Sequence, residues 1–202
     1  MLICFEGPSA VGKTTLSQSL STDFQVIPEA NQLFIRPENE PRLWYYHKQV
    51  ERYQMGVQAK RPVILDGDIF QPLWYNWTYD YPETFPSQKE THQFFQDNIA
   101  QEKMAFPDLY IIFKATHEQL RQRKQKDPTR TRRHFEKHLQ LIESQQRYFQ
   151  YLKSIGMAVA FVEYNDFDIT RNQVLSIIAA HKVAPRSHTE DFQKIIGWLT
   201  KN

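Results

Sequence analysis

Residues 7–15 read Gly7-Pro8-Ser9-Ala10-Val11-Gly12-Lys13-Thr14-Thr15. The first eight match the pattern GxxxxGK[ST], which is typical of a loop that wraps around phosphate groups. The context agrees, because the apolar run 2–6 precedes the loop as a strand and a helix-forming run follows it. Glycines in the loop let the backbone approach an anion closely, so that N–H groups and the helix N-terminus face it. The stretch therefore predicts an anion-binding turn between a buried strand and a helix.

Two side chains of this loop have expected roles of their own. Lys13 would reach the β- and γ-phosphates of a nucleoside triphosphate, and the Thr14 hydroxyl would bind a magnesium ion. We therefore expect the segment 7–15 to bind ATP with Mg²⁺, although GTP is left open as the donor. The guanine-binding motif Asn-Lys-x-Asp of Ras-type GTPases does not occur in the sequence, which favours a small kinase.

The rest of the chain alternates between short apolar runs and helical patterns. Most of the apolar runs are continuous, as in strands buried on both faces of a parallel sheet. Strands are expected at 2–6, 24–27, 62–66, 109–113 and 158–162, and helices at 13–20, 43–57, 88–104, 117–126, 135–152, 170–181 and about 189–201. The pattern predicts a three-layer α/β fold in one domain, residues 1–202, with the last helix docked on the same core.

The composition is ordinary for a folded domain, with 41% hydrophobic and 24% charged residues among 202. No apolar run is long enough to span a bilayer, and the amino terminus shows no secretory pattern. Cys4 is the single cysteine, which excludes an internal disulfide and suits a reducing compartment. We expect a cytoplasmic protein without membrane association. The net charge of +2 makes nucleic acid the least favoured partner, and a homodimer is left open.

Acidic residues follow two of the expected strands. In an open parallel sheet, ligands bind beyond the carboxyl ends of the strands. Asp66 closes the third strand and is the expected magnesium residue together with Thr14. Glu29 follows the second strand and is the preferred general base, because phosphoryl transfer needs a group that orients the acceptor and takes its proton. Asp68 is the competing candidate, and its alternative role is to cap a following helix.

A segment rich in arginine and lysine follows the fourth strand, and Asp127-Pro128 interrupts its helical pattern. We expect a flap, about 121–133, that closes over the triphosphate, stabilises charge on the transferring phosphoryl group and excludes water. The alternatives are a solvated helix face and a nucleic-acid patch. The first candidates for phosphate contact are Arg121, Arg130 and Arg133.

Aromatic residues are concentrated between positions 34 and 85. They exceed what the amphipathic helix 43–57 needs for its apolar stripe. A planar or apolar small-molecule acceptor stacked between rings is one interpretation, and core packing is the other. Trp44 and Trp74 are the aromatic candidates for the substrate pocket, beside Glu29 and Asp68.

Taken together, these residues resemble the nucleoside and nucleotide kinases of the P-loop class, especially deoxynucleoside kinases and thymidylate kinase. The resemblance covers most of residues 1–181. It rests on the phosphate loop, on Pro28-Glu29, on the run 106–112 and on the arginine-rich segment up to Arg133, which resembles the LID of that family. It implies strand order 2-3-1-4-5, ATP with Mg²⁺, Glu29 as base, LID arginines around the phosphates, and the base of ATP near Asn165 and Asp166.

The chain departs from this family at two places. Deoxynucleoside kinases carry Glu-Arg-Ser after the third strand, where this chain has Asp66-Gly67-Asp68. Thymidylate kinases place an acid inside the phosphate loop, where this chain has Ser9-Ala10. An acceptor outside the nucleosides and nucleotides, such as an antibiotic, a sugar or another hydroxylated metabolite, is therefore left open. Two other classes of function remain as alternatives: a non-catalytic ATP-binding regulator with a protein partner, and a polynucleotide 5′-kinase.

Overall fold

The computed structural model describes residues 1–79, 85–127 and 135–202. Its centre is a five-stranded parallel sheet in the order β2-β3-β1-β4-β5, with helices on both faces. The strands are β1 (Leu2–Glu6), β2 (Gln25–Ile27), β3 (Val63–Asp66), β4 (Leu109–Lys114) and β5 (Val159–Glu163). This confirms the three-layer α/β fold and the strand order. Each strand agrees with its predicted range to within one residue at either end.

The alternation of side chains along β1 divides the core into two clusters, one on each face of the sheet. Ile3 and Phe5 pack with residues of α1 (Lys13–Ser19) and α9 (Phe167–Ala180). Leu2 and Cys4 contribute to the other cluster, on the opposite face of the sheet. All five residues of β1 are buried, as the continuous apolar run predicts for a central parallel strand.

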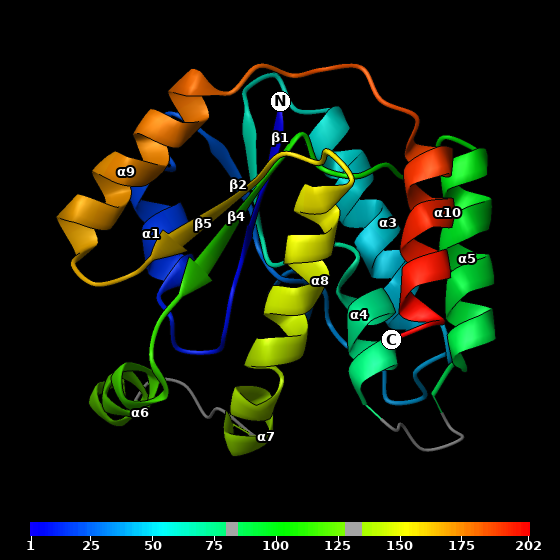
Figure 1. Ribbon diagram of the computed structural model, residues 1–202, viewed down its shortest axis with the longest axis horizontal. Coiled ribbons are helices and arrows are strands. Elements are labelled where there is room, and N and C mark those ends of the chain that lie inside the picture. Colours follow the sequence, from blue (N-terminus) through cyan, green and yellow to red (C-terminus); the bar gives the residue numbers. More distant parts are fainter. Residues whose placement is uncertain (80–84, 128–134) are drawn as a thin grey trace.

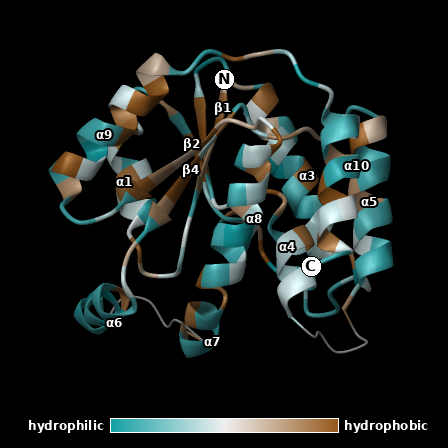
Figure 2. Cartoon of the chain, viewed as in Figure 1, coloured by the Kyte–Doolittle hydropathy of each residue, from teal (hydrophilic) through white to brown (hydrophobic). Residues whose placement is uncertain are grey.

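The helices form two outer layers, which Figure 1 shows to the left and right of the sheet. Apolar residues gather in the strands, and the outer helical surfaces are largely hydrophilic (Figure 2). On the larger side lie α3 (Trp44–Val57), α4 (Gln71–Thr78), α5 (Gln88–Ala100), α8 (Ile142–Ser154) and α10 (His188–Leu199). The remaining helices are α2 (Ala30–Leu33), α6 (His117–Lys126) and α7 (Phe135–Gln140). Of these, α6 and α7 lie beyond the carboxyl ends of the strands, where Figure 1 draws them below the sheet.

Local hydrogen bonds determine where several helices begin. A capping box starts α5, where Ser87 and Glu90 each accept a hydrogen bond from the other's backbone N–H. Thr116 and Gln119 make the same reciprocal pair at the start of α6. Such pairs satisfy N–H groups that have no partner inside the helix. They explain why the expected starts of these two helices agree with the structure.

Three helical predictions need correction. The predicted helix 88–104 ends at Ala100. The predicted helix 135–152 is two helices, because the chain makes a tighter turn in which the N–H of Leu141 donates to the carbonyl of His138. Helix α4 was expected only as a helix that Asp68 could cap. Its start tolerates Pro72 because the first turn leaves N–H groups without helical partners.

The last helix packs on the same core as the sheet. Three apolar side chains of α10 are buried in the cluster that also contains residues of α5, and they are Phe192, Ile195 and Leu199. Among the described residues, no helix is long and apolar enough to cross a membrane.

The burial of α10 can be tested with two adjacent isoleucines. Ile195→Ala should lower the free energy of unfolding by about 2–5 kcal/mol, because it leaves a cavity in a closed part of the core. Ile196→Ala is the matched control and should cost less, since Ile196 is only partly buried. Urea unfolding followed by circular dichroism measures both values. Equal losses for the two variants would contradict the docking of α10 through this face.

Candidate active site

A cavity of about 750 Å³ opens at the carboxyl ends of β1 and β2. The whole of the predicted phosphate-binding segment lines it, from Gly7 to Thr15. Facing this segment are Glu29 and Asn31 from the start of α2 and residues of α4, α6 and α8. The position is the one expected for a ligand site in an open parallel sheet.

The phosphate loop is curled rather than extended. The N–H of Val11 donates to the carbonyl of Pro8 at 3.2 Å, and Ala10 has a φ of 70°. Gly12 has a φ of 111°, and a Cβ atom there would lie 2.8 Å from Cζ of Tyr164. Position 12 therefore requires glycine for its backbone conformation and for the close approach of the tyrosine ring. Helix α1 begins immediately afterwards at Lys13, which directs its N-terminus toward the loop.

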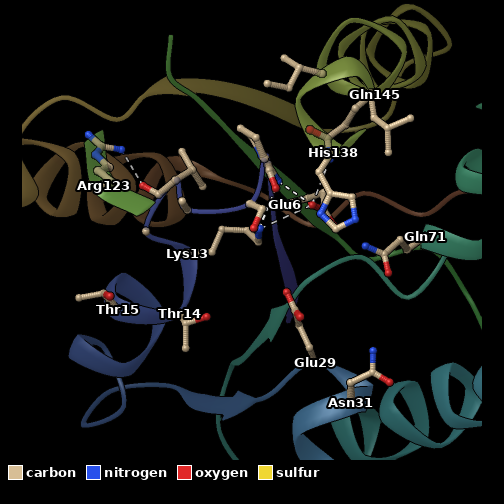
Figure 3. A pocket seen from close by; sticks show the side chains of 18 of the residues that line it. Glu6, Lys13, Thr14, Thr15, Glu29, Asn31, Gln71, Arg123, His138 and Gln145 are labelled. Atoms are coloured by element: carbon tan, nitrogen blue, oxygen red, sulfur yellow. Dashed lines mark hydrogen bonds and ion pairs between the residues drawn. The ribbon is translucent and has the colours of Figure 1, made fainter. Parts of the chain in front are cut away.

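Lys13 lies at the base of this loop. Its Nζ donates to the carbonyl of Gly7 at 2.7 Å and is 3.9 Å from Oε1 of Glu6. The side chain extends into the same cavity as Glu29, as Figure 3 shows. An ammonium group and a carboxylate thus line one space at the mouth of the phosphate loop.

Glu6 is a site residue that the sequence analysis missed. This residue, at the end of β1, is only 2% exposed. Oε1 accepts hydrogen bonds from the N–H of Gly7 at 2.7 Å and from Nε2 of Gln145 at 3.1 Å. Oε2 accepts from the N–H of Asp68 at 2.8 Å. The carboxylate therefore joins the phosphate loop, the turn after β3 and helix α8. The sequence did contain one signal for this role, an acidic residue at the end of the apolar run 2–6. A charge buried in such a strand needs polar partners.

The predicted magnesium residues Thr14 and Asp66 are neighbours. Burial raises the pKa of the Asp66 carboxyl, the Lys13 charge opposes this rise, and the Glu29 charge adds to it; a hydrogen bond from the Thr14 side chain also opposes it. Oδ1 of Asp66 is buried and has no hydrogen-bond partner among the described residues. A hydroxyl and an incompletely bonded carboxylate are oxygen donors of the kind that Mg²⁺ prefers. The residues present therefore suit this ion.

The prediction that Asp68 competes with Glu29 as the base is corrected by its surroundings. Asp68 is buried, and it is not among the described residues that line the cavity. Its Oδ1 accepts from the N–H of Phe70 at 3.0 Å, and its Oδ2 accepts from Nε1 of Trp74 at 3.2 Å. Burial and the nearby Glu6 charge raise its pKa to about 7. Asp68 thus holds the turn before α4, close to the capping role considered for it.

The two predicted tryptophans differ in position. Trp74 lines the cavity but is only 1% exposed, and its indole N–H is bonded to Asp68, so it acts mainly as a packed wall. Trp44 is absent from the described lining and lies near Lys48, whose Nζ is 6.0 Å from its ring centre. The next residue on α3, Tyr45, lines the cavity instead. Neighbouring helical positions differ in direction by about 100°, which is why this prediction is wrong by one residue.

Tyr45 also lines a smaller cavity of about 210 Å³. Its hydroxyl donates to Oε1 of Gln71 at 2.8 Å. The residues that line both cavities are Asn31, Tyr45, Gln71 and Tyr75. The side of the site opposite the phosphate loop therefore combines two phenol rings with two amides. Tyr45 and Tyr75 are thus aromatic residues of the lining that the sequence analysis did not single out.

Arg123 is the arginine of α6 that reaches the phosphate loop. Its Nη1 donates to the carbonyl of Val11 at 2.8 Å, and its Nη2 donates to the carbonyl of Tyr164 at 2.6 Å. The guanidinium also lies over the Tyr164 ring, 4.8 Å from its centre. Figure 3 shows it at the edge of the cavity. Arg123 thus ties α6 to the loop and to the segment after β5.

The prediction for Arg121 is wrong, because this side chain points to solvent. It is exposed and pairs with Glu136 at 2.9 Å, and only its neighbours on the other side of α6 line the cavity. Helix α6 buries a single residue, Leu120, so its sequence pattern gave little indication of its rotation. Arg130 and Arg133 lie outside the described residues. The predicted flap 121–133 is therefore described only as far as Asp127, where α6 ends as expected.

Comparison with protein-family models gave no match, and comparison with curated protein sequences gave no significant match. Solved structures do match. A deoxyadenosine kinase from M. mycoides with bound dATP has a TM-score of 0.58 and 16% identity, covering 89% of this chain and 100% of its own. Thymidylate kinase from Candida albicans has a TM-score of 0.57 and 20% identity, covering 92% and 95%. The YorR protein of Bacillus subtilis, in complex with phosphorylated GDP, has a TM-score of 0.56 and 14% identity, covering 89% and 96%.

These likenesses establish the fold. The chain has a P-loop fold like that of nucleoside and nucleotide kinases, with the phosphate loop and the sheet order that this fold requires. The coverage is nearly complete on both sides, so the shared arrangement includes the sheet and its surrounding helices.

The junction made by Glu6 can be tested against a glutamate in the corresponding place on another strand. Glu6→Gln replaces an accepting oxygen by an amide that donates, so one of the buried N–H groups of Gly7 and Asp68 loses its partner. We expect the free energy of unfolding to fall by about 1–3 kcal/mol. The control is Glu163→Gln at the end of β5, where the side chain is 63% exposed, and it should change stability by no more than about 0.5 kcal/mol. Thermal and urea unfolding measure both, and similar effects would contradict the structural role of Glu6.

Proposed function

We propose that this protein is a phosphotransferase that moves the γ-phosphoryl group of ATP onto a hydroxyl or phosphate group of a small molecule. The observation that carries the proposal is that one cavity is lined by a curled phosphate loop, by Lys13 and by the carboxylate of Glu29. The kinase-like fold supports it, because the solved structures of similar fold include a deoxyadenosine kinase and a thymidylate kinase.

The donor side is built from the segment 7–15. Its backbone N–H groups and the N-terminus of α1 would hold the phosphates, and Lys13 would leave the carbonyl of Gly7 to reach the transferring group. Thr14 and Asp66 would hold Mg²⁺. When bound, this ion would neutralise charge that develops on the phosphate oxygens. Arg123, anchored on the loop carbonyl of Val11, would border the same space.

The acceptor side is built around Glu29. This residue lies where β2 gives way to α2, and its side chain extends into the cavity (Figure 3). As the acceptor oxygen forms its bond to the γ-phosphorus, the bond from phosphorus to the β–γ bridging oxygen breaks and ADP leaves. The hydroxyl proton passes to the Glu29 carboxylate. Asn31, Gln71 and the rings of Tyr45 and Tyr75 would orient the acceptor.

Exclusion of water is the remaining requirement, since water would otherwise accept the phosphoryl group. Helices α6 and α8 contribute Arg123, Lys126, Ile142 and Gln145 to the cavity, on the side away from α2. Their residues would narrow access to the phosphates when ATP is bound.

Two substitutions test the reaction. Lys13→Ala and Glu29→Gln should each lower kcat by about 10²–10³, because each removes a charged group that acts in the transition state. Turnover is measured with ATP and Mg²⁺ against a panel that contains deoxyadenosine, thymidine 5′-monophosphate, sugars and hydroxylated antibiotics. Glu29→Gln should leave ATP binding intact, as followed by thermal shift.

Glu38→Gln is the control for this pair, because Glu38 lies in the exposed segment after α2 and should have no effect. Near-native transfer by Lys13→Ala with any acceptor of the panel would overturn the proposed function. Loss of ATP binding in Glu29→Gln would instead assign Glu29 to the donor side.

The metal site has its own test. Asp66→Asn removes a buried negative charge beside Thr14, so the Mg²⁺ concentration for half-maximal activity should rise by about 10–100-fold. The stabilisation of the protein by ATP should lose its dependence on Mg²⁺, while stabilisation by ATP with excess chelator stays the same. An unchanged Mg²⁺ requirement would exclude Asp66 as a metal residue.

A further inference from the structure

The Glu29 side chain rests on a stretch of backbone that has no side chain. Gly67, between β3 and α4, has a φ of +87°. A Cβ atom on this residue would lie 3.1 Å from Cγ of Glu29 and 3.5 Å from its Oε1. The first distance is shorter than nine in ten of the contacts that real Cβ atoms make. A side chain at position 67 would therefore force either the backbone of this turn or Glu29 to move.

The backbone of the turn is held from several directions. The N–H of Gly67 donates to the carbonyl of Phe5 at 2.9 Å. The N–H of the following residue donates to Glu6, the acid that also binds the phosphate loop. On the other side, Nη2 of Arg52 donates to the carbonyls of Asp66 at 2.7 Å and Gly67 at 3.0 Å.

These contacts are in the interior, where bonds to a charged group are strong and leaving a partner unsatisfied is costly. Arg52 is only 1% exposed, although it is an arginine on α3. A residue of the same helix also holds the guanidinium in place, because Nη1 donates to Oε1 of Gln49 at 2.7 Å. The turn is thus fixed by groups from β1 and α3. Of the two partners in the contact, Glu29 is the one that can move.

We infer that Gly67 is a positioning residue for Glu29. Because residue 67 has no side chain, the Glu29 side chain can pack directly against the backbone of the turn, and this contact determines where its carboxylate lies. Arg52 holds that backbone in place. This inference rests on the proposed role of Glu29 as the base. It explains why the central residue of the segment 66–68 is a glycine. A larger residue there would occupy the space that Glu29 uses to face the acceptor.

The size of the effect follows from the distances. Glu29 must give way by a few tenths of an ångström, and misplacement of a reacting group by about 1 Å can cost about 10²-fold in rate. Gly67→Ala should therefore lower kcat by about tenfold. The KM for ATP should change by less than about twofold, since the phosphate loop itself is not displaced.

The chain offers a matched control for the strain of the substitution. Gly156, in the turn between α8 and β5, has a φ of +88°, and no described atom lies within 4 Å of a Cβ built on it. Gly67→Ala and Gly156→Ala therefore impose the same unfavourable backbone conformation, but only the first creates a contact with Glu29. We expect both variants to lose a similar amount of thermal stability, and only Gly67→Ala to lose kcat. This result would assign the loss of kcat to the contact with Glu29. If either alanine variant does not fold, Gly67→Asn and Gly156→Asn replace the pair, because asparagine tolerates positive φ best among residues with a Cβ.

A second variant distinguishes positioning from general damage. In the Glu29→Gln background the carboxylate is already lost, so Gly67→Ala should lower kcat no further. A purely structural effect would lower kcat by the same factor in both backgrounds. Turnover is measured with deoxyadenosine and, in parallel, with water as the acceptor of the phosphoryl group.

Crystal structures of the two glycine variants give a readout that needs no acceptor. The Glu29 carboxylate should be displaced from the Gly67 backbone in Gly67→Ala and unmoved in Gly156→Ala. An unmoved carboxylate in Gly67→Ala, or equal kcat in the two variants, would overturn the inference while leaving the function intact. If Glu29→Gln itself retains full turnover, the proposed role of Glu29 fails instead, and the two failures are thereby told apart.

Discussion

The arrangement of the site depends on one buried carboxylate at the end of the central strand. Glu6 cannot remain charged in the interior without hydrogen bonds, and its three partners come from separate parts of the chain. One is the first residue of the phosphate loop, one belongs to the turn after β3, and one is a glutamine of α8. The same contacts that satisfy the charge therefore fix the phosphate loop, the turn after β3 and helix α8 relative to one another. The three hydrogen bonds that offset the cost of burying the acid also produce this alignment.

The sequence predicted the fold well because its signals are local. A central parallel strand is a continuous apolar run, and the phosphate loop is a short pattern with fixed glycines, so both are visible without knowledge of their partners. The strand order followed from the resemblance to a family rather than from the pattern of the chain. The break at Leu141 was hidden, because apolar residues keep helical spacing on both sides of it.

The site was predicted less completely, for physical reasons that differ between residues. Glu6 meets partners 62 and 139 residues away, and nothing near it in the sequence shows them. Trp44 and Arg121 were each chosen one or two positions from the residue that faces the cavity. On α6 only Leu120 is buried, so the helical pattern carries almost no information on which side faces inward. The sequence therefore indicated that this basic segment could contact phosphate, but only the structure showed which side of α6 faces the cavity.

The hydrogen bond between Tyr45 and Gln71 has a consequence for molecular size. Both side chains line the larger cavity as well as the smaller one. A compact molecule bound in the larger cavity alone would leave this hydrogen bond intact. A longer molecule that extended into the smaller cavity would meet this pair. The phenol and the amide would then have to exchange their mutual hydrogen bond for bonds to the ligand. Along a homologous series of ligands, the binding affinity would therefore change in a step at the length that first reaches the hydrogen bond between Tyr45 and Gln71.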